Sequence, residues 1–216
     1  MMRGDGEHQT VTLPYIREAL NEHSRLFEIL PCLSNNFCKC KAMNEMIFLN
    51  SAIQQFRDYK SLAEKTFAQL RDDDFHYQPN EVTNSIAINI THLHGNMLSR
   101  WTNFLTEDGE KEWRQRDDEF ETHSYSREKL LQLWEEGWQA VFNALESLQP
   151  ADLAKIIFIR SKPLTVIDAI HRQLTHYVSH AGQIIMLGKI IKNTAWQSLS
   201  IPKGESGRYN ADLIKK

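Results

Sequence analysis

The sequence predicts an all-α protein built as a four-helix bundle, with a long crossover between its second and third helices. The chain has 216 residues, of which 41% are hydrophobic, so it is long enough for one sizeable core. After residue 45, four segments carry apolar residues at the period of an α-helix. No single helix of this kind can bury its apolar stripe alone, and packing four of them together solves that problem.

The first 45 residues differ from the rest, and we interpret them as a peripheral N-terminal extension to a bundle domain that spans residues 46–216. A short amphipathic helix after Pro14 is compatible with the spacing of its apolar residues. The segment also holds every cysteine of the chain. Cys38 and Cys40 are too close together for a zinc knuckle, so we interpret them as free thiols in a loose segment.

The first two predicted helices follow in order. One runs from Met46 to about Leu70, where its stripe ends before an acidic run and the break at Pro79. The next begins after Ser85, a residue type that often caps helix N-termini, and extends to about Leu105.

The connection at residues 106–124 is rich in charge and shows little periodicity. An extended chain spans about 3.3 Å per residue, so a segment of this length can return along a 20-residue helix, which is about 30 Å long. The third helix can therefore start beside the start of the second. This length favours a crossover at that point.

The third predicted helix runs from about Ser126 to Leu148, and the fourth from about Thr165 to Lys192. Thr165 and Asp168 have the spacing of a capping box at the start of the fourth helix.

Composition excludes two classes of function. The formal charge of −3 leaves no excess of cations for a run of phosphates, so we expect no nucleic-acid partner. No stretch approaches the roughly 20 apolar residues that cross a bilayer, and the N-terminus lacks the apolar run of a secretory signal. We therefore expect a cytoplasmic protein without a membrane partner.

Five of the nine histidines fall in two short clusters. His176 and His180, four residues apart on the fourth helix, are separated by about 40° around its axis and about 6 Å along it. Two imidazoles so placed can share one metal ion. His171 lies about 140° away from His176, so we assign it a packing or surface role.

On the second helix, His92 and His94 are about 200° apart, so only one of them can face a site between helices. Helical phasing places His94 in the apolar stripe with Ile90 and Trp101, and places His92 on the flank. Phasing alone therefore favours His94 as the third ligand.

Three segments, THLHGNMLSRWTNFL, DGEKEWRQRDDEF and QLTHYVSHAGQI, resemble a subgroup of the DinB-like superfamily related to bacillithiol- and mycothiol-dependent transferases. The resemblance covers about residues 46–200. It implies a four-helix bundle that binds a divalent metal through one histidine of the second helix and an HxxxH pair of the fourth. By motif position it implies the ligands His92, His176 and His180, and it also implies a homodimer.

The expected function is a divalent-metal-dependent enzyme of hydrolase or thiol S-transferase type, whose three-histidine site keeps one coordination position open. Three imidazoles suit zinc, nickel, iron and copper equally, so the sequence does not identify the ion. The expected substrate is a small molecule or a low-molecular-weight thiol. The alternative is a dimeric stress-response or interaction module in which the metal is structural or absent.

No residue outside the three histidines is assigned a catalytic role. Asn96 and Gln183 could orient a ligand, but we interpret them as solvated, since Asn and Gln are mostly exposed. Asp117, Asp118 and Glu119 could supply a general base, but an acidic run in a loop is usually solvated surface.

Overall fold

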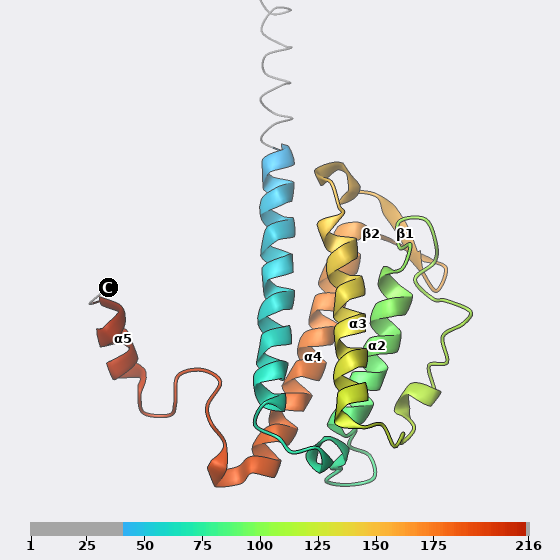
Figure 1. Cartoon of the computed structure of the whole chain (residues 1–216). Coiled ribbons are helices and arrows are strands. Elements are labelled where there is room, and N and C mark those ends of the chain that lie inside the picture. Colours follow the sequence, from blue (N-terminus) through green and yellow to red (C-terminus); the bar gives the residue numbers. More distant parts are fainter. Residues whose placement is uncertain (1–40, 215–216) are drawn as a thin grey trace, which may run out of the picture. The chain divides into compact units, whose positions relative to one another are not determined.

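The computed structural model describes residues 41–214, and most of that length is helical. Four long helices carry the core: the helix at 41–67, α2 (Ile86–Trp101), α3 (Arg127–Glu146) and α4 (Val166–Lys192). They lie side by side from residue 46 onward (Figure 1). The all-α expectation is therefore met in its main content, with one small sheet in addition.

The first helix is already present at residue 41, five residues before the start that the sequence predicted. Residues 41–50 contain no Gly or Pro, and Lys41 lies 4.0 Å from Glu45 one turn later, so nothing in this stretch stops a helix. The predicted helix after Pro14 and the three cysteines lie outside the described residues.

Both predicted helix caps are confirmed. The Ser85 hydroxyl accepts a hydrogen bond from the backbone N–H of Ile88 at 3.1 Å. At the start of α4, Thr165 and Asp168 form a reciprocal capping box. The end of α2 was predicted too late, because the backbone is already extended at Thr102 and turns to a positive φ of 50° at Asn103.

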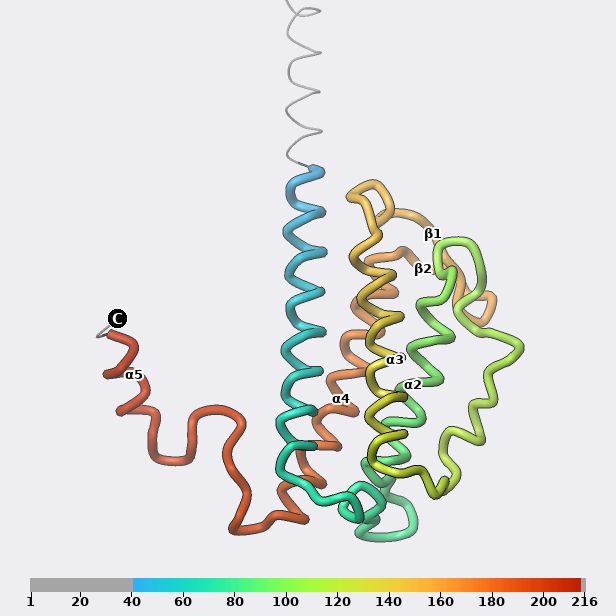
Figure 2. The backbone as a smooth tube through the Cα atoms, in the orientation of Figure 1, coloured from blue at the N-terminus to red at the C-terminus, as the bar shows by residue number. Residues whose placement is uncertain are grey.

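The helices run in two directions (Figures 1 and 2). The helix at 41–67 and α4 run one way, and α2 and α3 run the other way. The chain between α2 and α3 returns along the outside of α2 and contains the short helix η2 (Asp118–Phe120). This course brings the charged connection back over the middle of α2.

A β-hairpin between α3 and α4 was not predicted. Strands β1 (Ile156–Ile159) and β2 (Lys162–Thr165) pair antiparallel, and Arg160 and Ser161 form the turn with φ of 54° and 59°. The carboxylate of Asp108 accepts hydrogen bonds from both turn N–H groups, at 2.8 and 2.7 Å. This long-range contact fixes two residues in a conformation that non-glycine residues seldom adopt.

The core is one apolar cluster to which all four long helices contribute. The approach of α3 to α2 is close at Gly137, where a Cβ would lie 2.9 Å from Met97 Sδ and 3.3 Å from His94 Cα. At the C-terminus, α5 (Ser206–Ile214) has no buried residue. Among the helices of residues 41–214, none combines the length and apolarity that crossing a bilayer requires.

Candidate metal centre

Three histidine rings from two helices converge on one point. His92 comes from α2, and His176 and His180 come from successive turns of α4. The Nε2 atom of His176 lies 3.3 Å from Nε2 of His92 and 3.1 Å from Nε2 of His180. One ligand atom from each ring lies within 4.8 Å of the other two, so the cluster could hold a metal ion.

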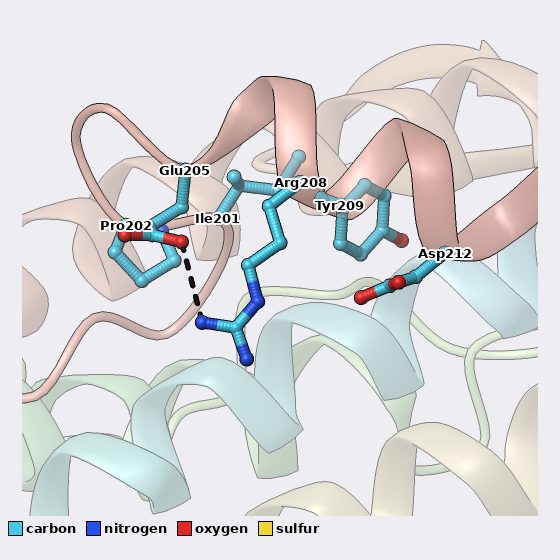
Figure 3. A pocket seen from close by; sticks show the side chains of 6 residues that line it. All are labelled: Ile201, Pro202, Glu205, Arg208, Tyr209 and Asp212. Carbon is cyan, nitrogen blue, oxygen red and sulfur yellow. Dashed lines mark ion pairs between the residues drawn. The ribbon is translucent and has the colours of Figure 1, made fainter.

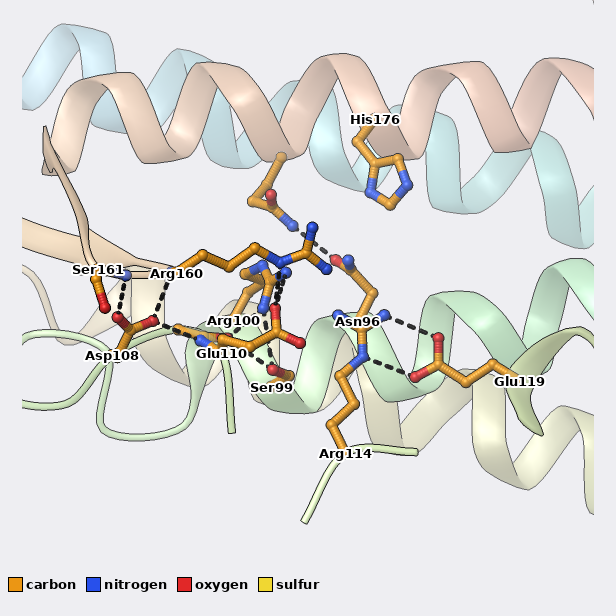
Figure 4. A network of polar contacts seen from close by, with 12 residues as sticks. Asn96, Ser99, Arg100, Asp108, Glu110, Arg114, Glu119, Arg160, Ser161 and His176 are labelled. Carbon is orange, nitrogen blue, oxygen red and sulfur yellow. Dashed lines mark hydrogen bonds and ion pairs between the residues drawn. The ribbon is translucent and has the colours of Figure 1, made fainter. Parts of the chain in front are cut away.

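Hydrogen bonds fix the orientation of the His92 ring from behind. Its Nδ1 lies 3.0 Å from Oε2 of Glu119, a buried carboxylate of η2. Arg114 holds the same carboxylate with two bonds, from Nε at 2.7 Å and from Nη2 at 2.8 Å, as Figure 4 shows. A carboxylate accepts and cannot donate, so the proton of a neutral His92 ring is placed on Nδ1 and the lone pair on Nε2.

The His180 ring is fixed in the same way by an amide. Its Nδ1 lies 2.7 Å from Oδ1 of Asn89, and the Nδ2 of Asn89 donates to the backbone carbonyl of Ser85 at 2.9 Å. Since the amide nitrogen is used in that second bond, its oxygen faces His180 as an acceptor. The proton of His180 is therefore also placed on Nδ1, and its Nε2 lone pair points at the cluster.

The pKa values of the groups in and behind the cluster favour binding of a metal cation over binding of further protons. Burial, reinforced by the neighbouring His180 and His92, lowers the pKa of His176 to about 3. Burial and His92 lower the pKa of His180 to about 4. Burial opposes ionisation of Glu119, but the bonds from Arg114 and His92 outweigh it and lower the pKa of that carboxyl. The rings of His176 and His180 are thus neutral donors, and the carboxylate behind the cluster is charged.

The distances between donor atoms fit a divalent ion. Two ligands at about 2.05 Å from a tetrahedral zinc ion are separated by about 3.3 Å. The Nε2 separations of 3.3 and 3.1 Å match that value. His92 and His180 both direct an Nε2 lone pair at the cluster, whereas His176 can donate at most one N–H from its Nε2. At least one of the two lone pairs therefore accepts no hydrogen bond within the cluster. The residues present therefore fit a bound metal.

His94 lies elsewhere. Its Nε2 is 3.3 Å from Oε2 of Glu136 on α3, and its pKa is lowered mainly by burial. Phasing alone favoured His94, and that interpretation is wrong for the histidine cluster. The reason is that α2 is enclosed on two sides: α3 covers the face of His94, while α4 covers the face of His92.

The remaining candidates divide between surface and interior. His171 is exposed, with its ring against Phe48, and Gln183 is exposed as interpreted. Asn96 is buried instead of solvated, and its Oδ1 accepts from Gln173 Nε2 at 2.7 Å. The sequence suggested no partner for it, because the partner lies 77 positions away.

Of the acidic run in the connection, Asp117 and Asp118 are exposed and Glu119 is buried. Interpreting all three as solvated surface was therefore wrong for Glu119. The signal that could have found it is Gly95 on α2, where a Cβ would lie 2.1 Å from Glu119 Oε1. A glycine beside two helical histidines leaves room for another segment to approach.

A cavity of about 450 Å³ opens beside the cluster. His92 and His176 form part of its wall, so a small molecule in it would reach two of the three rings. Another pocket, of about 410 Å³, lies within the C-terminal segment (Figure 3). Its lining contains no histidine or cysteine, and we do not assign the site there: Ile201, Pro202, Glu205, Arg208, Tyr209 and Asp212.

Comparison with known families gives a match to the model described as "Protein of unknown function (DUF1572)", over residues 44–205. The matched range includes all three histidines of the cluster together with Glu119 and Asn89. No curated protein matches the chain.

Proposed function

The chain belongs to the family described as Protein of unknown function (DUF1572), and we propose that it is a divalent-metal-dependent enzyme of hydrolase or thiol S-transferase type. Its metal ligands in this proposal are His92, His176 and His180. The observation that carries the proposal is the convergence of three Nε2 atoms beside a cavity that can admit a small molecule.

We further propose that the fold is a DinB-like four-helix bundle. Four long helices around one apolar core, in two directions and with a long connection between α2 and α3, support this assignment. The grouping of the histidine pair on α4 with a single histidine on α2 also supports the assignment, since the resemblance implies ligands from the second and fourth helices.

The composition of the cluster favours a catalytic site over a structural one. Structural zinc sites are usually saturated by four protein ligands, whereas catalytic sites have three and a position for water or substrate. In residues 41–214, the cluster contains three histidines and no cysteine or carboxylate as a fourth member. When bound, a divalent ion on three neutral imidazoles keeps its double charge, lowers the pKa of a water or thiol ligand, and polarises a carbonyl group.

The protein's own groups have separable roles in this proposal. The three rings hold the ion, Glu119 and Asn89 orient two of these rings, and Arg114 keeps the Glu119 carboxylate ionised and in place. The cavity positions the substrate, a small molecule or a low-molecular-weight thiol, beside His92 and His176. Zinc, nickel or iron is the expected ion, because imidazole donors suit all three.

Elemental analysis of protein purified without chelator tests the metal site. We expect about one divalent ion per chain in the wild type, and much less in His176→Ala and His180→Ala. His171→Ala is the matched control, because this histidine lies on the same helix but is exposed and outside the cluster. Wild-type protein without metal, or variants that retain as much as the control, would refute the proposal.

Cobalt substitution distinguishes an open site from a saturated one. If the fourth position accepts exogenous ligands, azide changes the visible spectrum of the Co(II) protein in a saturable way. An unchanged spectrum would instead favour the non-enzymatic module with a structural metal.

We also propose a cytoplasmic homodimer that acts without a nucleic-acid or membrane partner. Large apolar side chains exposed on the described surface, among them Ile47 and Met186, are compatible with association of two copies. Light scattering of the purified protein tests the dimer, and a monomeric mass at micromolar concentration would contradict it.

A further inference from the structure

The cavity beside the histidine cluster has a strongly cationic wall. Besides His92 and His176, its lining includes five arginines from four different segments of the chain: Arg100, Arg114, Arg116, Arg160 and Arg172. In a chain with a formal net charge of −3, such a concentration of guanidinium groups is a local feature and not a consequence of composition.

Two of these arginines form the buried floor. Arg100 donates through Nη2 to Oε2 of Glu110 at 2.9 Å, and Arg114 holds Glu119 as described above. Burial, together with the charge of Arg114, lowers the pKa of Arg100. The Nε of Arg100 is buried without a hydrogen-bond partner among the described residues. Each guanidinium of the floor is thus matched by one carboxylate, and the unpartnered Nε of Arg100 leaves the floor with hydrogen-bonding capacity.

The other three arginines form the rim. Arg160, at the hairpin turn, donates from Nε to Glu110 at 2.8 Å, and its two terminal nitrogens make no hydrogen bond or ion pair with residues 41–214. Its side chain extends from the hairpin in the direction of Asn96 and His176 (Figure 4). Arg116 is half-exposed over the Phe120 ring, 3.6 Å from a fully exposed Asp117 carboxylate.

Arg172 is the least satisfied of the rim groups. It is exposed on α4, and no ion pair or hydrogen bond of its guanidinium occurs with any described residue. It precedes His176 by four residues, so both side chains lie on the same face of the helix. An anion held by Arg172 would thus lie close to the histidine cluster.

We infer that this cavity binds an oxyanion, a carboxylate or phosphoryl group, of the small molecule on which the metal centre acts. The five guanidinium groups are accompanied by four carboxylates, those of Asp108, Glu110, Glu119 and Asp117, which leaves one positive charge in excess. The planar N–H forks of Arg160, Arg172 and Arg116 suit the paired oxygens of such groups. The inference rests on the proposed function and names the substrate class of the same site.

The size of the cavity favours a small molecule over a polymer. Its volume of about 450 Å³ lies in the range of ordinary ligand sites. A nucleic acid backbone is expected to be bound by a stripe of basic residues. These arginines instead surround one cavity.

Titration with inorganic phosphate and, separately, with succinate tests the inference by calorimetry at constant ionic strength. Metal-free full-length protein is used, so that binding of the anion to a metal ion is excluded. We expect saturable binding of at least one of the two probes, weakened about tenfold or more in Arg160→Gln and in Arg172→Gln. Which probe binds more tightly shows whether the cavity prefers phosphoryl or carboxylate oxygens.

Arg57→Gln is the matched control. Its side chain is 55% exposed against 52% for Arg160, and it is likewise paired with a glutamate, but it does not line the cavity. We expect the control to bind as the wild type does. Absence of saturable binding of both probes, or equal binding by the rim variants and the wild type, would overturn the inference.

The two proposals fail in different ways. Wild-type protein that holds no metal in elemental analysis but still binds the anion refutes the metal-dependent function and not the cationic site. Stoichiometric metal without anion binding refutes this inference and leaves the metal centre intact.

Discussion

Glu119 Oε2 lies 3.0 Å from Nδ1 of His92, which joins a connection between helices to a histidine of α2. The contact fixes which nitrogen of the ring is free to bind a metal. Because Arg114 binds the same carboxylate with two bonds, the ring, the carboxylate and the guanidinium form one chain of charge-assisted contacts. Each link can be tested by itself.

Glu119→Gln should lower the affinity for the metal about 10- to 100-fold, since an amide is a weaker acceptor for the Nδ1 proton. The measurement is competition with a chromophoric chelator. Asp118→Asn is the control, because Asp118 is the adjacent carboxylate and its side chain is 67% exposed. An unchanged affinity in Glu119→Gln would show that the contact does not support the site.

Gly95→Ala should also weaken metal binding, through the same carboxylate. The added Cβ would lie 2.1 Å from Glu119 Oε1, so the Glu119 side chain must move away from His92. Gly182→Ala on α4 is the control, because a Cβ there meets nothing within 4 Å and alanine is the better helix former. If chelator competition gives equal affinities for the two variants, the close approach of Glu119 is not needed for binding.

His92→Ala should lose most of the metal while His94→Ala retains it. Only His92 lies with the α4 pair, whereas His94 is directed to Glu136. Elemental analysis of both variants, purified in parallel with the wild type, gives the result. Retention by His92→Ala and loss by His94→Ala would reverse the assignment of the third ligand.

Tyr177→Phe should destabilise the protein by about 1–3 kcal/mol, because it leaves buried polar partners unsatisfied. The Tyr177 hydroxyl accepts from Trp101 Nε1 and from Gln173 Nε2, both at 3.0 Å. Urea unfolding measures the change, and Tyr209→Phe, at a residue 48% exposed, should stay within about 0.5 kcal/mol. Equal effects of the two substitutions would contradict a stabilising role of the buried network.

The metal-free protein should lose stability as the pH falls below about 6.5. The folded state holds the pKa of His176 at about 3 and that of His180 at about 4, while the unfolded chain binds protons near 6.5. In this window the unfolded state binds more protons, so the free energy of unfolding decreases as protons are added. Urea unfolding at pH 7, 5.5 and 4.5 measures the decrease, which should be smaller in His176→Asn. A decrease of the same size in that variant would assign it to other groups.

The elements with strong local signals were predictable. The period of apolar residues gave the four long helices, and Ser85 and the Thr165–Asp168 pair gave two of their starts. The β-hairpin was not predictable in the same way, because its turn has no glycine or asparagine. Asp108 supplies the missing support from a distance of about 50 residues along the chain.

In the candidate site, too, local sequence signals predicted some residues and long-range contacts determined the others. The spacing of His176 and His180 alone predicted a pair, since helix geometry relates residues four apart. The third ring, the Glu119 carboxylate and the Asn89 amide come from other segments, and spacing carries no information about them.

The sequence by itself determined a mostly helical protein with a histidine pair on its last long helix, because both follow from periodicity within one segment. Motif resemblance implied His92 and helical phasing favoured His94, and the tertiary structure brings His92 to the pair. It also buries Glu119 behind His92 and lines one cavity with five arginines. The physical reason is that a helix side acquires its environment only when another segment packs against it.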